Sequence, residues 1–479
     1  MSQAPLLTVR AVEAYERPFK LRLPFRFGIT TVTHGRQAVV RLCVRLADGR
    51  EGWGYSAEAL AAKWFDKNPA LSDEQNLDQL RQALQLAAAA YRASGPQTAF
   101  GFFADHYAAH NAACGRLGLL PLVASFGPAL LDRAILDALC RLHGVSFYAA
   151  MRANLPGMVP HAILPDLQDF DFDAFLAGLR PQARIHARHT VGLVDPITAS
   201  DQAPGTRVGD GLPETLEEVV QVYGHRYYKL KVGGDLAADI DRLGRIAAVL
   251  DRIPDPYRAT LDGNEQYETA EAALALWRAI EAAPNLARLR AATLFVEQPI
   301  KRQTALQASV AAFAAAKPLI IDESDGELGS FVAARALGYS GVSSKACKGF
   351  YKSLANLARC RRWNAGAAPG SGYFMSGEDL TVQAGTSLQQ DLALVSLLGL
   401  VHVERNGHHF IDGFAERPAS ESDAFLAAHP DLYHRQGERV RLRIERGELA
   451  LGSLDCPGFG TAVEPDIAAL TPMPAARWP

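Results

Sequence analysis

The second half of the chain alternates short apolar segments with longer amphipathic ones. From about residue 183, eight strand-like segments occur within about 220 residues, and helical patterns separate them. Strands that alternate with helices are typical of βαβ units, which pair their strands in parallel. Eight strands in this arrangement predict a closed parallel βα barrel.

The two ends of the chain have a different pattern. Residues 6–56 contain alternating runs around the turn Ala-Asp-Gly-Arg (47–50), which indicates hairpin strands, and residues 57–155 have mainly helical spacing. Alternating strands return after about residue 406. We predict an N-terminal α+β capping domain (1–155), a barrel (156–405) and a C-terminal segment (406–479) that completes the capping domain.

Composition argues against several classes of protein. The formal net charge is −3 and both signs are mixed along the chain, which disfavours a nucleic-acid partner. The six cysteines lie far apart without a CxxC pair, as expected of reduced thiols. No apolar run is long enough to span a membrane, and the first residues lack a signal-peptide pattern. We therefore expect a soluble cytoplasmic protein without a membrane partner.

Charged residues stand at the ends of consecutive predicted strands, where a βα barrel carries its chemistry. In chain order they are Lys229 and Lys231, Asp262, Glu297, Asp322, and Lys345. Three carboxylates on three neighbouring strands should converge, and their repulsion is relieved by a hard divalent cation that prefers oxygen ligands. The pattern predicts a Mg²⁺ site with lysines on either side.

Lys229 and Lys231 lie two residues apart, so both side chains should point to the same face of a strand. Taken alone, the pair is most simply a solvated strand edge, but carboxylates opposite it favour an inward direction. Adjacent ammonium groups and a nearby cation disfavour protonation, so a lysine here can act as a base near pH 7. The predicted reaction removes a proton next to a carboxylate, while Mg²⁺ stabilises the enediolate.

The ordered motifs resemble those of the enolase superfamily, within it the muconate-lactonizing-enzyme-like (mandelate racemase/muconate lactonizing enzyme) group. They are Lys-Leu-Lys (229–231), Leu-Asp-Gly-Asn (261–264), Val-Glu-Gln-Pro (296–299), Asp-Glu-Ser (322–324) and Ser-Ser-Lys-Ala-Cys-Lys-Gly (343–349). Residues 134–151 and 454–466 are similar to parts of the family's capping domain, so the likeness covers nearly the whole chain. It implies a modified TIM barrel, (β/α)7β, with an α+β capping domain, and a homo-oligomer.

The resemblance also implies a role for each charged residue. The Mg²⁺ ligands would be Asp262, Glu297 and Asp322. Lys231 would be one base, with Lys229 lowering its pKa, and Lys345 would be the acid/base on the other face. Because the customary double glycine near this last lysine is missing, Lys348 is a rival for its role.

Two loops of the capping domain, Phe25–His34 and about Gly54–Phe65, would cover the barrel mouth and select a small carboxylate substrate. Tyr55 and Trp64 in the second loop are about equally consistent with core aromatics. Other candidates for substrate contact are Asn264, Glu323 and Glu404. Insertions near residues 66–125 and 195–213 have no assigned role.

Three histidines, His402, His408 and His409, invite a metal interpretation, but a polar loop after a strand explains their spacing equally simply, and we prefer that explanation.

Lysines on both faces of one carbon predict a racemase or epimerase. The alternative is a lyase, either a dehydratase or a cycloisomerase, on the same scaffold. A third hypothesis is a barrel that binds a small carboxylate without turnover, supported only by the polar end of the sixth strand.

Overall fold

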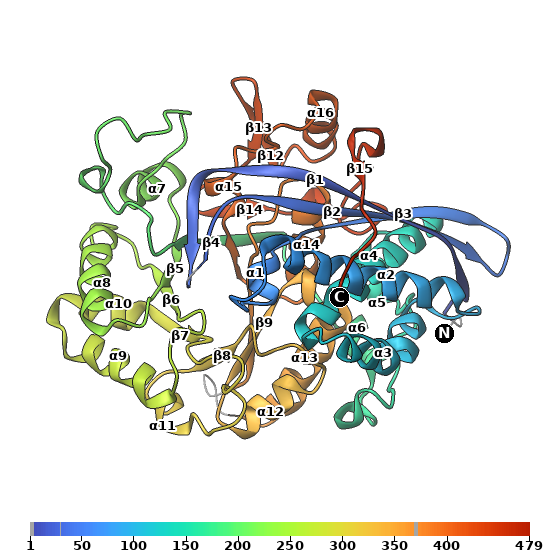
Figure 1. Cartoon of the computed structure of the whole chain (residues 1–479), viewed down its shortest axis with the longest axis horizontal. Coiled ribbons are helices and arrows are strands. Elements are labelled where there is room, and N and C mark those ends of the chain that lie inside the picture. Colours follow the sequence, from blue (N-terminus) through green and yellow to red (C-terminus); the bar gives the residue numbers. More distant parts are fainter. Residues whose placement is uncertain (1–3, 29, 368–371) are drawn as a thin grey trace.

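The computed structural model describes residues 4–28, 30–367 and 372–479, and its centre is a closed parallel barrel (Figure 1). The barrel strands are β4 (Arg184–Val191), β5 (Tyr227–Lys231), β6 (Arg258–Asp262), β7 (Thr293–Glu297), β8 (Leu319–Ile321), β9 (Gly341–Ser344), β10 (Phe374–Gly377) and β11 (His402–Arg405). Each strand pairs in parallel with the next, and β11 pairs with β4 to close the ring. The predicted barrel is confirmed.

Helices connect consecutive strands and cover the outside of the barrel (Figure 1). They are α7 (Leu216–Tyr223), α8 (Leu236–Leu250), α9 (Ala270–Ala282), α10 (Ala287–Ala292), α11 (Ala311–Ala314), α12 (Ser330–Ala336), α13 (Phe350–Asn364) and α14 (Thr386–Leu397). Side chains that bond the first turn fix several starts: Thr215 caps α7, Asp235 caps α8 and Thr269 caps α9. The short helix α15 (Gly407–Phe410) comes directly after β11, the last parallel strand of the barrel, so the arrangement has the (β/α)7β form.

The capping domain combines an antiparallel sheet with three long helices. The sheet contains β1 (Leu7–Phe27), β2 (Thr30–Leu46) and β3 (Glu51–Ala59), and the helices are α2 (Asp73–Ala93), α3 (Ala99–Arg116) and α4 (Pro121–His143). Helix α4 packs directly on β3 at Gly54, where a Cβ atom would lie 2.0 Å from the Ala134 carbonyl oxygen. Only glycine permits this close approach.

The last part of the chain returns to both domains. Strand β14 (Glu448–Ala450) pairs antiparallel with β4 of the barrel, and β15 (Thr471–Pro472) pairs with β1 of the capping sheet. Along the chain, α16 (Ala419–Ala428) and the hairpin of β12 (Tyr433–Gln436) and β13 (Arg439–Leu442) lie between the last barrel strand and β14. The shorter helices elsewhere are α1 (Ala62–Phe65), α5 (Phe147–Arg152) and α6 (Phe172–Ala177).

Two expected loops have regular structure instead. Most of Phe25–His34 belongs to a long hairpin of β1 and β2, in which Phe25 pairs with Val32. Ile29 lies outside the described residues. Residues 54–59 belong to β3, and α1 follows. Much of the insertion near 66–125 forms α2 and α3. Among the described helices, none has the length and apolar character needed to cross a membrane.

Candidate active site

A cavity of about 670 Å³ lies between the barrel mouth and the capping domain. Its barrel side includes five of the predicted site residues: Lys229, Lys231, Asn264, Lys345 and Glu404. Its capping side comes mainly from the β1–β2 hairpin, which extends across the barrel (Figure 1), and from the segment around α1. This size and mixed lining suit a small organic ligand.

Lys229 points into the barrel and is enclosed by carboxylates. Its Nζ atom lies 2.9 Å from Asp262 Oδ2, 2.8 Å from Glu297 Oε2, 2.7 Å from Glu378 Oε2 and 2.9 Å from Glu404 Oε2. Only 1% of the residue is exposed. The alternation along β5 therefore places the lysine pair inward, where the anionic residues are, and places Leu230 outward.

The sequence predicts that two adjacent ammonium groups disfavour each other's protonation, but the pKa of Lys229 is shifted the other way. Burial alone would lower its pKa, but the four carboxylates raise the pKa well above its ordinary value. Lys229 is therefore a fixed cation that holds four strands' acids together. A cation bound by Asp262 and Glu297 would compete with it for the same oxygens, because each carboxylate has a limited number of lone pairs.

The two proposed bases sit beside different carboxylates. Lys231 Nζ lies 2.5 Å from Asp262 Oδ2, at the end of β6, and Lys345 Nζ lies 2.6 Å from Asp322 Oδ2, just after β8. The ammonium group of Lys345 also lies 4.1 Å from the ring centroid of Trp64, a cation–π contact from the capping domain. The lysines come from strands on opposite sides of the acidic group and line one cavity.

Lys348 occupies a different position from Lys345. Its Nζ atom donates to Ser343 Oγ at 2.7 Å and lies 3.1 Å from Asp325 Oδ2 and 3.4 Å from Asp322 Oδ1. Among the described residues that line the cavity, Lys345 is present and Lys348 is not. The geometry therefore favours Lys345 for contact with a ligand.

The three predicted metal ligands are all buried at the ends of adjacent strands. Asp262, Glu297 and Asp322 are at most 1% exposed, yet among the described residues they do not form a group whose oxygens all lie within 4.8 Å. Lys229 intervenes between the first two. Burial, followed by repulsion from Asp262 and Glu378, raises the pKa of Glu297 well above its usual value.

Glu297 provides the test of whether this group suits a hard cation. Although Lys229 is near, no described donor makes a well-directed hydrogen bond to either carboxylate oxygen. A buried carboxylate without directed donors is costly, and an oxygen-binding cation would satisfy it. The donor set, three carboxylates on three strands, fits Mg²⁺.

A second ionic group connects the capping domain to the barrel mouth. Lys67 Nζ lies 2.5 Å from Glu265 Oε2 and 3.2 Å from Glu323 Oε1, and it donates to the Asn264 carbonyl oxygen. Asn264 Nδ2 in turn donates to Glu323 Oε1 at 3.2 Å. Of these two predicted substrate residues, Asn264 lines the cavity, whereas Glu323 is engaged with the capping domain.

Glu404 lies on β11 and its oxygens already have partners. Oε1 accepts from Thr190 Oγ1 at 2.6 Å and from Asn406 Nδ2 at 2.9 Å, and Oε2 accepts from Lys229. Burial by itself would raise its pKa, but Lys229 and Lys231 hold the pKa of Glu404 well below its usual value. It is an ionised wall of the cavity.

Tyr55 does not have the position expected of a lid residue. It belongs to β3, its hydroxyl donates to Glu464 Oε2 at 2.6 Å, and its backbone N–H donates to Asp137. It is absent from the described residues that line the cavity. Gly54 and Ser56 of β3 face α4, so Tyr55 between them points to the other face of the sheet, and of the two aromatics only Trp64 lines the cavity.

Sequence reasoning missed Glu378, Arg188 and Lys67. Glu378 directly follows β10 and forms ion pairs with Lys229 and with Arg188 of β4. The rule used for the other strands, a charged residue at the strand end, identifies Glu378 once β10 is placed correctly. No comparable rule identifies Lys67, because it reaches the barrel from a connection between α1 and α2.

Comparison with known proteins agrees with this geometry. Residues 211–467, more than half of the chain, match the family described as Enolase C-terminal domain-like. No curated protein sequence matches the chain.

Similar folds occur in several solved structures. A dipeptide epimerase from Enterococcus faecalis V583, solved with Mg and the dipeptide L-Leu-L-Tyr, has a TM-score of 0.60 at 14% identity, covering 95% of this chain and 99% of that one. Muconate lactonizing enzyme from Pseudomonas fluorescens has a TM-score of 0.59 at 17% identity, covering 95% and 97%. 2-Chloromuconate cycloisomerase from Rhodococcus opacus 1CP has a TM-score of 0.58 at 18% identity, and the match covers 95% of this chain and 97% of that one. The chain belongs to the enolase superfamily, in its mandelate racemase/muconate lactonizing enzyme-like group.

Proposed function

We propose that the barrel mouth removes the proton next to the carboxylate of a small organic acid, and that it returns the proton to the opposite face. The observation that carries this proposal is the placement of Lys231 and Lys345 on two sides of one cavity, with buried carboxylates between them. The protein would then be a racemase or an epimerase.

Asp262, Glu297 and Asp322 would hold Mg²⁺. When bound, the ion would supply positive charge beside the substrate carboxylate and so stabilise the enediolate. It would also occupy oxygens that now contact Lys231 and Lys345. Burial alone would lower the pKa of Lys345, but Asp322 raises this pKa above its ordinary value. Release of Lys345 from this ion pair would therefore lower the pKa of its ammonium group, which is what a lysine base near neutral pH needs.

The other residues of the site supply fixed charge or enclose the substrate. Lys229 stays protonated among four acids, so it contributes fixed positive charge and does not act as the base. Trp64 covers Lys345 from the capping side and, with the β1–β2 hairpin, keeps water from the reacting carbon. The similar epimerase was solved with a dipeptide and the lactonizing enzyme with muconolactone, which supports a small acid as the ligand class.

The test is exchange of the α-proton in D₂O with Mg²⁺, followed by NMR over a panel of N-acyl amino acids, dipeptides, acid sugars and cyclic carboxylates. Wild type should exchange deuterium into both stereoisomers of one acid. Lys231→Ala and Lys345→Ala should each lose about 10²–10⁴-fold in the rate at one face. Lys63→Ala, which changes a lysine on the capping wall of the same cavity, is the matched control.

Each alternative has its own outcome. Exchange accompanied by loss of water or by ring closure would favour the lyase. Mg²⁺ binding without exchange from any acid would favour a binding barrel. If Lys348→Ala abolished exchange at the second face and Lys345→Ala did not, the assignment of the second base would be wrong.

A further inference from the structure

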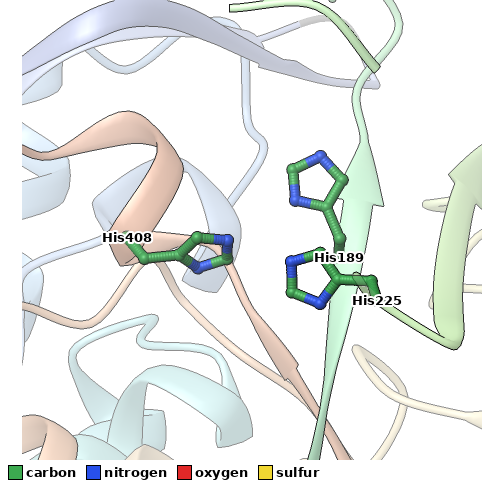
Figure 2. A group of neighbouring side chains, drawn as sticks. All are labelled: His189, His225 and His408. Atoms are coloured by element: carbon green, nitrogen blue, oxygen red, sulfur yellow. The ribbon is translucent and has the colours of Figure 1, made fainter. Parts of the chain in front are cut away.

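Three buried histidines lie close together (Figure 2), and they are not among the described residues that line the cavity of the proposed catalytic lysines. His189 lies on β4, His225 lies between α7 and β5, and His408 lies on α15. They are 2%, 1% and 8% exposed. Because β4 alternates, Arg188 and Thr190 face the barrel interior, where they contact Glu378 and Glu404, and His189 faces the opposite way.

Each of these rings has at least one nitrogen without a hydrogen-bond partner among the described residues. Among the described residues, none bonds Nδ1 of His189, Nε2 of His225, or either nitrogen of His408. Buried polar atoms are normally paired, and an unpaired one costs about 1–3 kcal/mol. Three neighbouring rings with this deficit share one requirement: an electron-pair acceptor or donor placed between them.

His225 shows which kind of partner is needed. Its Nδ1 atom lies 2.9 Å from the carbonyl oxygen of Ala187, an acceptor, so Nδ1 carries the proton and Nε2 presents a lone pair. This is the arrangement by which proteins orient a metal-binding histidine. A cation or a proton donor placed between the rings would satisfy this lone pair.

The rings are neutral at physiological pH. Burial lowers the pKa of His225 to about 4, and burial together with the neighbouring histidines lowers the pKa of His189 and His408 well below the usual value. Glu404 opposes this effect at His189, and Arg405 adds to it at His408. Neutral imidazole is the form that binds metals.

The distances suit a small ion after slight adjustment. One nitrogen from each ring can be chosen so that all three lie within 4.8 Å of one another. In a tetrahedral site with metal–nitrogen distances of about 2.0–2.1 Å, ligand nitrogens lie roughly 3.4 Å apart. Small rotations of the rings close this difference. His402, by contrast, lies against Arg188, and His409 is adjacent to the group without belonging to it.

We propose that His189, His225 and His408 bind one divalent transition-metal ion of the zinc class. Three imidazoles leave the fourth position for water, and His408 borders a cavity of about 190 Å³ from which that position is reached. Imidazole ligands select zinc-like ions, whereas the carboxylates inside the barrel suit Mg²⁺. The proposal is independent of the function proposed above, and it revises the preference for an incidental polar loop at His408.

The ion would connect three segments that are distant in sequence. Helix α15 carries His408 and, two residues later, Phe410, whose ring lies 4.5 Å from that of Phe25 on β1. Phe25 lines the large cavity. Binding at the histidines would therefore stabilise α15 and, through it, the hairpin over the barrel mouth.

The experiment is a titration of the chelator-stripped full-length chain with Co²⁺, in saturating Mg²⁺ so that the carboxylates are occupied. One Co²⁺ per chain should give the intense visible absorption of a tetrahedral site, and Zn²⁺ should displace it. His225→Ala and His408→Ala should abolish the band. His434→Ala, a histidine on the wall of the same small cavity, and Glu297→Gln should retain it.

Stability supplies a second readout that does not need the band. Zn²⁺ should raise the Tm of wild type and of His434→Ala, and should leave the Tm of folded His408→Ala unchanged. Wild type that binds neither ion would overturn the proposal and assign the unpaired nitrogens to ordered water. A band that persists in both ligand variants would overturn it as well, by placing the metal elsewhere.

Discussion

The barrel has polar groups inside it and, around β4, on its outer side, and the two sets are satisfied in different ways. Inside, Lys229 of β5 and Glu404 of β11 belong to a network of full charges with ion pairs of 2.7–2.9 Å. Outside, His189 of β4 and its neighbours are uncharged, and each has at least one ring nitrogen without a partner among the described residues. Inside, Glu297 lacks a directed donor but lies beside the cationic Lys229, whereas the unpartnered ring nitrogens outside have no charged partner among the described residues.

Removal of the central cation should give the largest effect on stability. In Lys229→Met, four buried carboxylates lose their common partner, so we expect a loss of about 3–5 kcal/mol in the free energy of unfolding, measured in urea. His225→Phe removes one hydrogen bond and should cost only about 1 kcal/mol. Equal losses would contradict the difference between the two faces.

The second-largest effect should be stabilisation by metal ions, which distinguishes the proposed Mg²⁺ site from the proposed Zn²⁺ site. At Mg²⁺ concentrations of about 100 times Kd, wild type should gain about 2.7 kcal/mol in the free energy of unfolding. Glu297→Gln should show no gain from Mg²⁺ but should keep its response to Zn²⁺. His408→Ala should show the reverse. A variant that lost both responses would indicate one shared site.

Lowering the pH should reduce the stability of the charged network inside the barrel through Glu404, and this effect should be smaller than the two above. Its folded-state pKa is depressed, so its contribution to stability is present above the unfolded value of about 4.5 and is lost as pH falls through the folded value. Urea midpoints measured from pH 7 to pH 3 should fall less steeply in Glu404→Gln than in wild type. A steeper fall in the variant would show that Glu404 is protonated in the native state.

The smallest effect on stability is expected at Lys67, where the capping segment contacts the barrel mouth. In Lys67→Gln, Glu265 keeps its ion pair with Arg302 and the new amide can still donate to Glu323, so the change should cost about 1 kcal/mol in stability. Its main consequence should be a higher KM, because the capping segment loses its ion pairs with Glu265 and Glu323. An unchanged KM with a lower kcat would assign Lys67 to the chemical step instead.

The barrel and most charged residues of its mouth were predictable because both follow local rules. Period and length identify the strands, and the carboxyl end of each strand identifies Lys231, Asp262 or Glu297. The contacts of Lys67 and the burial of Tyr55 were not predictable, since they depend on how the capping domain lies on the barrel. The histidine group also escaped prediction, because its members are 36 and 183 residues apart in order along the chain.

The short strand β15 has a consequence for how the molecule is made. Thr471 and Pro472 pair with Glu16 and Tyr15, so the sheet edge joins residues separated by nearly the whole chain. Contacts of such long range form late in folding and, when they are few, open early in native fluctuations. Because these two residues also line the large cavity, we expect a molecule cleaved before β15 to keep its barrel and to lose part of the cavity wall.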